Sequence, residues 1–313
     1  MVRRTAVDHA GSVRKTVNRN GPDQGGHNHT MRTVGVIGLG LIGGSMARAI
    51  TARTGASVYG YDADPEVVKK AIEDGVLSGE LGDHYGDVEL LIVALYPADV
   101  VGVILGVAGK LREGCIVVDC TGVKKFVCDA LSAKLADMKL RFIGGHPMAG
   151  KEVAGYENSC DDLFSRASMI LCRDDHTDED ALFEAGRFFK EAGFARITMT
   201  TPEDHDRVIA YTSQLAHVVS SAYIKSPTLD KRGGFSAGSF KDLTRVAKLN
   251  EEMWADLFIA NEEALVSEID EITGHLSEYA DAIRSKDRDR LVQLIRDGRI
   301  RKENDEAKDD KWT

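Results

Sequence analysis

The sequence predicts an α/β protein with an N-terminal doubly wound sheet and an all-helical C-terminal domain. Short apolar runs alternate with helix-like segments from residue 33 to about residue 200, and a glycine-rich turn joins the first run to the first helix. Only helical patterns follow residue 201. With 313 residues, the chain is long enough for two such domains.

Composition and charge limit the class of protein. Apolar residues make up 43% of the chain, and no run approaches the ~18–20 uninterrupted apolar residues of a membrane helix. We therefore expect a cytoplasmic protein without membrane contact. The net charge of -10 argues against a nucleic-acid partner, which would require a basic face. An anionic substrate would need cations placed locally at its binding site.

The cysteines indicate neither a disulfide framework nor a metal site. Their number is odd, no pair has C-x-x-C spacing, and three lie in or beside apolar runs. We expect buried thiols in a reducing compartment and no bound metal. The five are Cys115, Cys120, Cys128, Cys160 and Cys172.

The two ends of the chain differ in composition from the rest. The first 30 residues contain almost no aliphatic run, and in particular no apolar core of a secretory signal, so we predict a disordered extension over 1–31. Residues 301–313 are charged and are predicted to fray. The α/β domain is then expected over 32–200, and the helical domain over 201–300.

A nucleotide site is predicted where the first strand, 33–37, ends. The run GLGLIG at 38–43 follows this strand and opens a helix, the setting that makes a G-x-G-x-x-G pattern specific. The first glycine permits a tight turn, the second lets a pyrophosphate approach the backbone, and the third lets helix pack on strand. Free amides at the helix start would face the phosphate charge. The expected cofactor contacts are Gly38, Leu39, Gly40, Leu41, Ile42 and Gly43.

The choice of cofactor depends on Asp62, which follows the next predicted strand, 57–61, roughly 20 residues beyond the glycines. A carboxylate there accepts hydrogen bonds from the adenosine ribose and repels a 2′-phosphate, which favours NAD over NADP. The alternative is that Asp62 only caps the helix beginning at Pro65.

Strands and helices continue to alternate up to residue 200. The run 89–95 is almost continuously apolar, as expected for a strand buried on both faces. Its end carries Leu95 and Tyr96, which we assign to the cofactor site because ligands of such sheets bind at the carboxyl ends of strands. Further strands are predicted at 115–119, 142–143, 168–171 and 196–199, and helices at 98–111, 123–138 and 178–192.

His146 lies at another of these strand ends, between two pairs of small residues in GGHPMAG. A lone histidine is more often a structural residue than a catalyst. Its position at the ligand-binding edge of the sheet favours a catalytic role.

The second half reads as a helix from Pro202 to about 224, a glycine-rich loop at 233–239 and a long helix over 250–284. Apolar residues of the long helix repeat every seven positions, which requires a partner helix. The length favours a homodimer; a neighbouring helix of the same chain is the alternative. The two series are Phe258, Leu265 and Ile272, and Ile269, Leu276 and Ile283.

Polar residues of this half are candidates for a substrate site. Ser213 and His217 are four apart and share a helix face, whereas His205 is roughly 120° away from His217 at ~100° per residue on a straight helix. Asp242 could hold the guanidinium of Arg245, three residues later; a solvated surface pair is the alternative.

Together these motifs resemble the prephenate and arogenate dehydrogenase family of tyrosine biosynthesis. The resemblance covers about residues 32–300. It rests on GLGLIGGS at 38–45, GGHPMAG at 144–150 with Glu152 behind it, EDHDRVIAYTSQLAH at 203–217, GSFKDLTRVA at 238–247, and the nearby Met253 and Trp254.

The resemblance implies an NAD-dependent oxidative decarboxylation of prephenate to 4-hydroxyphenylpyruvate. It gives His146 the catalytic role, since a neutral imidazole accepts the 4-hydroxyl proton while the same carbon loses hydride. It assigns Arg245 to a substrate carboxylate, which a guanidinium binds in a bidentate pair. His217, Ser213 and Glu152 would line the substrate pocket.

Two positions depart from the family pattern and leave substrate choice open. Gly122 stands where many members have serine, and Thr121 could supply the hydroxyl, which would make it a substrate-binding residue. Lys151 stands where threonine is frequent. The nearest alternative is an arogenate dehydrogenase; more remote ones are a 2-hydroxyacid or imine dehydrogenase and a non-catalytic dinucleotide sensor.

Overall fold

The computed structural model describes residues 31–151 and 153–309. Except for Met31, the predicted N-terminal extension lies outside these residues, as do Glu152 and residues 310–313. Within the described residues, no helix is both long and apolar enough to cross a membrane.

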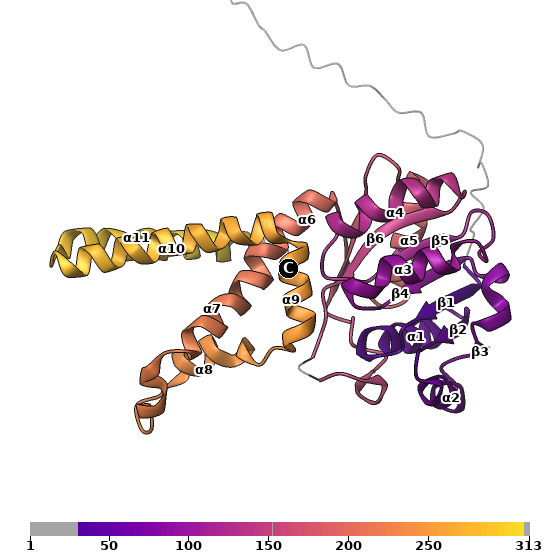
Figure 1. The fold of residues 1–313 in the computed structure, drawn as a ribbon, viewed down its shortest axis with the longest axis horizontal. Helices are drawn as coiled ribbons and strands as arrows, with labels where there is room; N and C mark the ends of the chain where they lie inside the picture. The colour runs from indigo at the N-terminus through magenta and orange to yellow at the C-terminus, as the bar shows by residue number, and fades with distance from the viewer. Residues whose placement is uncertain (1–30, 152, 310–313) are drawn as a thin grey trace, which may run out of the picture. The chain divides into compact units, whose positions relative to one another are not determined.

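The N-terminal half is built on one eight-stranded sheet in the order β3-β2-β1-β4-β5-β6-β7-β8 (Figure 1). The predicted fold class, a Rossmann-type sheet followed by helices, is confirmed. The strands are β1 (Thr33–Ile37), β2 (Ser57–Tyr61), β3 (Gly79–Glu80), β4 (Leu90–Val93), β5 (Ile116–Asp119), β6 (Arg141–Pro147), β7 (Ser168–Cys172) and β8 (Arg196–Thr200).

Helices cover the sheet and give it a hydrophobic core on each face. The four residues of β4 are all buried and alternate between the two cores, because successive side chains of a strand point to opposite faces. One core includes residues of α1 and α5, and the other residues of α3 and α4. These elements are α1 (Leu41–Arg53), α2 (Pro65–Glu73), η1 (Gly82–Asp87), α3 (Pro97–Ala108), α4 (Lys125–Asp137), η2 (Tyr156–Asn158) and α5 (Glu179–Glu191).

Strand β6 changes the direction of its pairing along its length. Up to Ile143 it pairs parallel to β5, and from Gly144 it pairs antiparallel to β7. The predicted strands up to residue 143 are therefore parallel, whereas β7 runs antiparallel to β6, because the chain reverses after Pro147 and returns without a crossover helix. As a result His146 lies inside β6, opposite Ile170, and is held by a strand ladder.

The helix predicted from Pro202 to 224 is interrupted. It consists of α6 (Pro202–Ile209), the π-helical turn η3 (Ala210–Gln214) and α7 (Leu215–Ile224). The long helix expected over 250–284 is also two helices, which are separated at Asn261. The remaining elements are η4 (Pro227–Lys231), α8 (Gly238–Thr244), η5 (Arg245–Ala247), α9 (Glu251–Ala260), α10 (Glu262–Arg284) and α11 (Arg288–Asp309).

The first heptad series and Ile269 of the second series lie on one surface, and the rest of the second series lies on another. Phe258, Leu265, Ile269 and Ile272 pack with Ala210, Leu215 and neighbouring residues of α7 in a small core within the chain. Leu276 and Ile283 are 63% and 60% exposed, so the far part of α10 presents apolar side chains. Helix α11 packs against α10 and continues to Asp309, so residues 301–309 are helical where we expected fraying.

Candidate active site

The glycine turn between β1 and α1 has a separate physical reason for each glycine. Gly38 has φ +83°, and a Cβ on it would lie 2.4 Å from the Ala94 carbonyl oxygen. A Cβ on Gly43 would lie 1.8 Å from the Gly38 carbonyl oxygen, so only glycine lets α1 pack this closely. A Cβ on Gly40 would meet nothing within 4 Å, which leaves room for a ligand beside the first amides of α1.

Asp62 is tied to this turn. One carboxylate oxygen accepts from the Leu39 amide at 2.7 Å and the other from the Asp64 amide at 3.0 Å. The cap of α2 is Asp64, whose side chain accepts from the Glu66 amide at 3.0 Å. Capping is therefore not the role of Asp62, and its remaining acceptor positions lie beside the glycine turn.

The end of β4 lies beside the same turn. Leu95 Cδ2 lies 2.8 Å from the position of a Cβ on Gly38, so this side chain contacts the glycine turn. Tyr96 occupies the N-cap position of α3 and is exposed. Leu41 and Ile42, in the first turn of α1, are half-buried. The residues predicted to hold a dinucleotide therefore gather at one edge of the sheet, and this edge has the shape and the free amides that a pyrophosphate requires.

A buried ion pair braces the strand that carries His146. Lys124 is fully buried, pairs with Asp119, and donates to the Gly145 carbonyl at 2.6 Å. Asp119 accepts from the Gly145 amide at 3.1 Å. A Cβ on Gly145 would lie 2.5 Å from the Asp119 carbonyl oxygen, so the glycine before His146 is required by this close approach.

Thr121 takes part in this brace. Its side chain is buried, with the hydroxyl 2.6 Å from an Asp119 carboxylate oxygen and 3.1 Å from Lys124 Nζ. We expected Thr121 to supply the hydroxyl of the family serine, and in this structure that hydroxyl is bonded to groups of the protein itself. A Cβ on Gly122 would lie 3.9 Å from His146 Nε2, so the serine position itself adjoins the imidazole.

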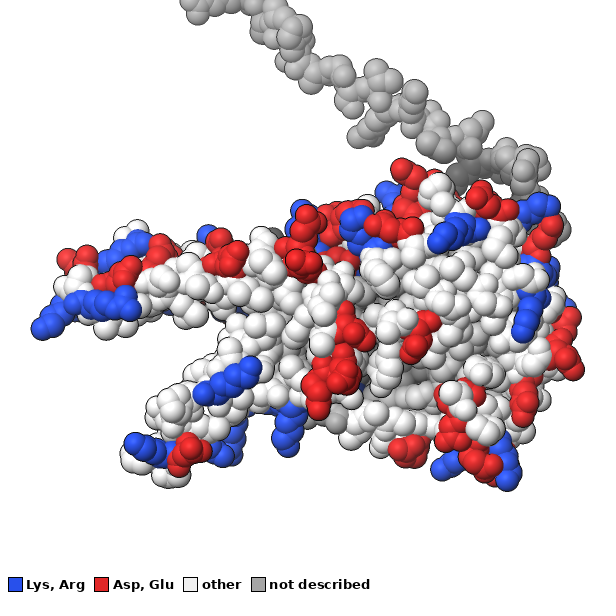
Figure 2. Space-filling view, viewed as in Figure 1, with Lys and Arg blue, Asp and Glu red and all other residues white. Residues whose placement is uncertain are grey.

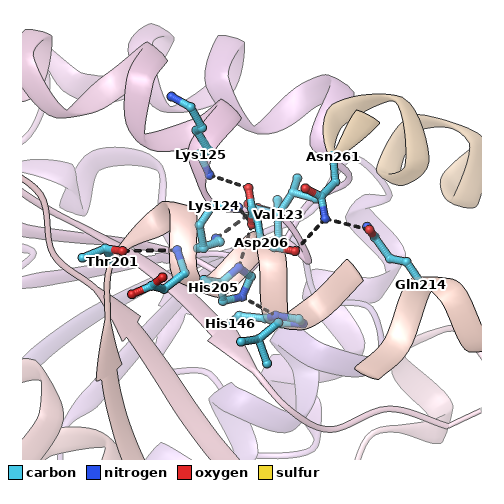
Figure 3. Close-up of polar contacts among 12 residues, drawn as sticks. Val123, Lys124, Lys125, His146, Thr201, His205, Asp206, Gln214 and Asn261 are labelled. Atoms are coloured by element: carbon cyan, nitrogen blue, oxygen red, sulfur yellow. Dashed lines mark hydrogen bonds and ion pairs between the residues drawn. The ribbon is translucent and has the colours of Figure 1, made fainter. Parts of the chain in front are cut away.

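His146 is the end of a three-residue hydrogen-bond chain, shown in Figure 3. Its Nδ1 lies 2.9 Å from Nε2 of His205, and Nδ1 of His205 lies 2.7 Å from a carboxylate oxygen of Asp206. Asp206 also accepts from the backbone amides of Lys124 at 2.7 Å and Lys125 at 2.9 Å, at the start of α4. His205 and Asp206 are buried, and His146 is half-buried.

The surroundings favour neutral imidazoles. Burial lowers the pKa of His146 well below its ordinary value of 6.5, with His205 and Lys124 acting in the same direction. Burial also lowers the pKa of His205, although its hydrogen bond to Asp206 opposes the shift. At neutral pH His146 is therefore uncharged and able to accept a proton.

A second cluster lies on α7 and α9. His217 donates from Nδ1 to the Ser213 carbonyl at 2.8 Å, because a carbonyl oxygen only accepts. Its ring stacks on Trp254 with centroids 4.0 Å apart and planes 29° apart. Arg245 is exposed on η5, which packs against α7. Glu152 lies outside the described residues.

The structure thus brings His146 together with His205, and Ser213 together with His217. Sequence reasoning considered His205 only as a neighbour of His217 on a straight helix, and it passed over Asp206. The available signal was the adjacent pair His205-Asp206 in the first turn of a helix that directly follows a strand.

The comparisons with known proteins agree with this arrangement. Residues 46–199 match the family model of the prephenate dehydrogenase nucleotide-binding domain, and residues 201–297 that of the prephenate dehydrogenase dimerization domain. Cyclohexadienyl dehydrogenase from Zymomonas mobilis is 32% identical over 278 residues, which cover 84% of this chain and 92% of that protein. Prephenate dehydrogenase from Bacillus subtilis is 26% identical, with coverage of 86% and 75%.

Solved structures agree as well. Prephenate dehydrogenase from Aquifex aeolicus, in complex with hydroxyphenyl propionate and NAD+, superimposes with a TM-score of 0.78 at 28% identity, covering 88% of this chain and 99% of that one. Arogenate dehydrogenase from Synechocystis shares the fold at a TM-score of 0.76 and 23% identity, covering 87% and 99%. The chain therefore belongs to the prephenate dehydrogenase family.

Proposed function

We propose that the protein catalyses the NAD-dependent oxidative decarboxylation of prephenate to 4-hydroxyphenylpyruvate in tyrosine biosynthesis. The observation that carries the proposal is the neutral, half-buried His146, whose Nδ1 is engaged by His205. Its other nitrogen, Nε2, adjoins Gly122 at the ligand-binding edge of the sheet. A proton acceptor in this place fits an alcohol oxidation beside a dinucleotide.

NAD is the cofactor, and it takes up the hydride that leaves C4 of the substrate. The first amides of α1 and the open space at Gly40 receive the pyrophosphate, and Leu95 and Tyr96 line the same edge. Asp62 binds the adenosine ribose hydroxyls and disfavours a 2′-phosphate by charge repulsion.

His146 moves one proton. Nε2 accepts the 4-hydroxyl proton as hydride leaves the same carbon, which gives a ring carbonyl. Loss of carbon dioxide then sends an electron pair into the ring and onto the carbonyl oxygen, and His146 returns its proton there to form the phenol. The reaction releases no net proton, so the imidazole must hold charge only briefly.

The helical half recognises the substrate's carboxylates and side chain. Arg245 forms a bidentate pair with one carboxylate. His217, fixed by Ser213 and stacked on Trp254, offers Nε2 to the substrate.

Arogenate is the second candidate substrate. It undergoes the same chemistry and differs only in an amino group where prephenate has a keto group. Gly122 and Lys151 depart from the family pattern near the substrate, and the His217 cluster is half-exposed, which allows it to accept a different side chain.

The helical half also forms a homodimer. Residues 201–297 match a domain described as a dimerization domain, and α10 and α11 expose Leu276, Ile283 and Ile295. In Figure 2 the surface over α7 and the adjoining flank of α10 is mostly uncharged on the face in view. A second copy would bury this surface.

The test measures NADH formation with prephenate and with arogenate, each offered separately. The proteins compared are wild type, His146→Asn and, as a control at an exposed histidine, His275→Asn. We expect turnover of prephenate, a loss of about 10³-fold in kcat for His146→Asn because the base is gone, and no change for His275→Asn. Turnover of arogenate alone would select the second candidate. An active His146→Asn variant would overturn the assigned base.

A further inference from the structure

Asp206, His205 and His146 are linked by two hydrogen bonds, and the chemistry of the three side chains determines which atom donates in each. The Asp206 carboxylate only accepts hydrogen bonds, and it takes two from backbone amides at the start of α4. The proton between Asp206 and His205 must therefore lie on His205 Nδ1, across the 2.7 Å contact.

The same reasoning continues to His146. Because burial keeps His205 neutral, a proton on its Nδ1 leaves its Nε2 bare, as an acceptor. His146 must then donate from Nδ1 across the 2.9 Å contact, and a neutral His146 has no proton left for Nε2. The bare nitrogen is the one that adjoins Gly122.

We propose that His205 and Asp206 are positioning residues, which hold His146 in the tautomer with a bare Nε2 and share its positive charge while it carries the substrate proton. This inference rests on the proposed function, because it deepens the role of His146. Neither residue needs to touch substrate or cofactor.

The charged groups around the two rings support charge sharing. Lys124, from the loop before α4, is neutralised by Asp119 of β5, which leaves Asp206 of α6 as the carboxylate directly bonded to a ring. Helix α9 contributes the apolar Leu257 beside Gly122. When His146 gains a proton, hydrogen bonds through His205 connect it to the negative charge of Asp206.

The position of Asp206 is fixed from both halves of the chain. Its side chain binds the start of α4 in the nucleotide-binding half. Its carbonyl oxygen accepts from Asn261 Nδ2 at 2.9 Å, and Asn261 also donates to Gln214 Oε1 at 2.7 Å (Figure 3). Because both halves hold this residue, the orientation of His146 depends on their correct docking.

The first test reads the tautomer directly. In protein labelled with ¹⁵N-histidine, two-bond ¹H–¹⁵N spectra at neutral pH distinguish a protonated ring nitrogen from a bare one, and the His146→Asn and His205→Gln variants identify the signals. We expect Nδ1 protonated and Nε2 bare in both His146 and His205. A proton on Nε2 of His146 would overturn the proposal.

The second test uses a pair of substitutions at one position. In His205→Leu the acceptor is lost, whereas in His205→Gln the amide can still donate to Asp206 and accept from His146 but cannot take up charge. We expect kcat/KM to fall about 10²- to 10³-fold in His205→Leu and about tenfold in His205→Gln, with KM and NAD binding nearly unchanged. His275→Leu, on the exposed face of α10, is the control.

The pH profile separates positioning from mere packing. In His205→Leu the acid limb of kcat/KM should move to lower pH, because a protonated His146 loses the acceptor of its Nδ1–H group. This loss outweighs the removal of the repulsion by which His205 lowers the pKa of His146, since that repulsion acts only when His205 is itself protonated. Two outcomes would contradict the proposal. One is a pH profile of His205→Leu in which kcat/KM is lower but the acid limb has not moved, and the other is an equal fall of kcat/KM in His205→Leu and His205→Gln. If His205→Leu does not fold, His205→Gln and the tautomer spectrum still decide. Wild type that turns over neither substrate, yet shows the expected tautomer, would instead remove the proposed function.

Discussion

The two ends of the candidate site are built differently. Around His146, the partner groups Lys124, Asp119, His205 and Asp206 are buried, and each is bonded to a strand or to the start of a helix. Around His217, the groups are half-buried or exposed, and a ring stack on Trp254 and one backbone hydrogen bond provide most of the order.

This difference corresponds to a division of labour. Removing a proton and a hydride requires the same geometry for prephenate and arogenate, so the reacting end benefits from a rigid frame. Because the two substrates differ at the side chain, the proposed function assigns their recognition to the less buried end. The family resemblance extends to relatives named for different cyclohexadienyl substrates.

Damage to the buried frame around His146 should lower the stability of the protein most. Lys124→Met should lower the free energy of unfolding by about 3–5 kcal/mol, because it leaves Asp119 charged and unpaired in the core. The neighbouring Lys125→Met removes an exposed pair with Asp129 and should cost less than about 0.5 kcal/mol. Urea denaturation measures both. If both variants lost the same small amount of unfolding free energy, the buried ion pair would not be needed for stability.

The recognition end should respond in binding and not in chemistry. Arg245→Ala is expected to raise KM for the substrate roughly ten- to hundredfold while kcat changes little, because a carboxylate partner is lost before the transition state. Arg207→Ala removes an exposed pair with Asp204 on α6 and serves as the control. Initial-rate kinetics test this. A fall in kcat with unchanged KM would place Arg245 at the reacting end.

Gly122 lies where the two ends meet. Gly122→Ser should place a hydroxyl within reach of His146 Nε2, although Leu257 must shift by a few tenths of an ångström. We expect kcat/KM several-fold above that of Gly122→Ala, which introduces the same Cβ without the hydroxyl. Steady-state kinetics at neutral pH compare the two variants. Identical values would mean that the hydroxyl does not reach the base.

The smallest expected effect is on stability in mild acid. The pKa values of His146 and His205 lie below 6.5 in the folded state, so the unfolded chain takes up protons first as the pH falls. The free energy of unfolding should therefore decrease between about pH 6.5 and about pH 5.5, and the decrease should be smaller in His205→Leu. Urea titrations across this range would detect it; a flat profile would contradict neutral histidines.

Local patterns were enough to predict most of the sheet. The strands, the glycine turn and the position of Asp62 depend on residues that are close in sequence. The structure places the glycine turn and Asp62 together at the expected edge of the sheet. The antiparallel pairing of β6 with β7 could not be predicted, because it depends on the path of the 20 residues between Pro147 and Ser168.

The details of the site depend on contacts that no local pattern reports. His146 and His205 are 59 positions apart, and their pairing follows from the docking of α6 on α4. From the sequence, Thr121 could supply the hydroxyl of the family serine because it is adjacent to Gly122. In the structure its hydroxyl is hydrogen-bonded to Asp119. The break at Asn261 follows from hydrogen bonds to Asp206 and Gln214, which lie in another helix.

The π-helical turn at Ala210–Gln214 changes the helical register between α6, which carries His205, and α7, which carries His217. It holds one residue more than a regular turn, so His205 before it and His217 after it are not related by a straight helix. If the same residues were wound as a regular α-helix, α7 would be rotated by ~100° relative to α6. His217 would then leave Trp254 while the His146–His205 pair stayed intact, so the turn sets the orientation of the His217 cluster relative to that pair.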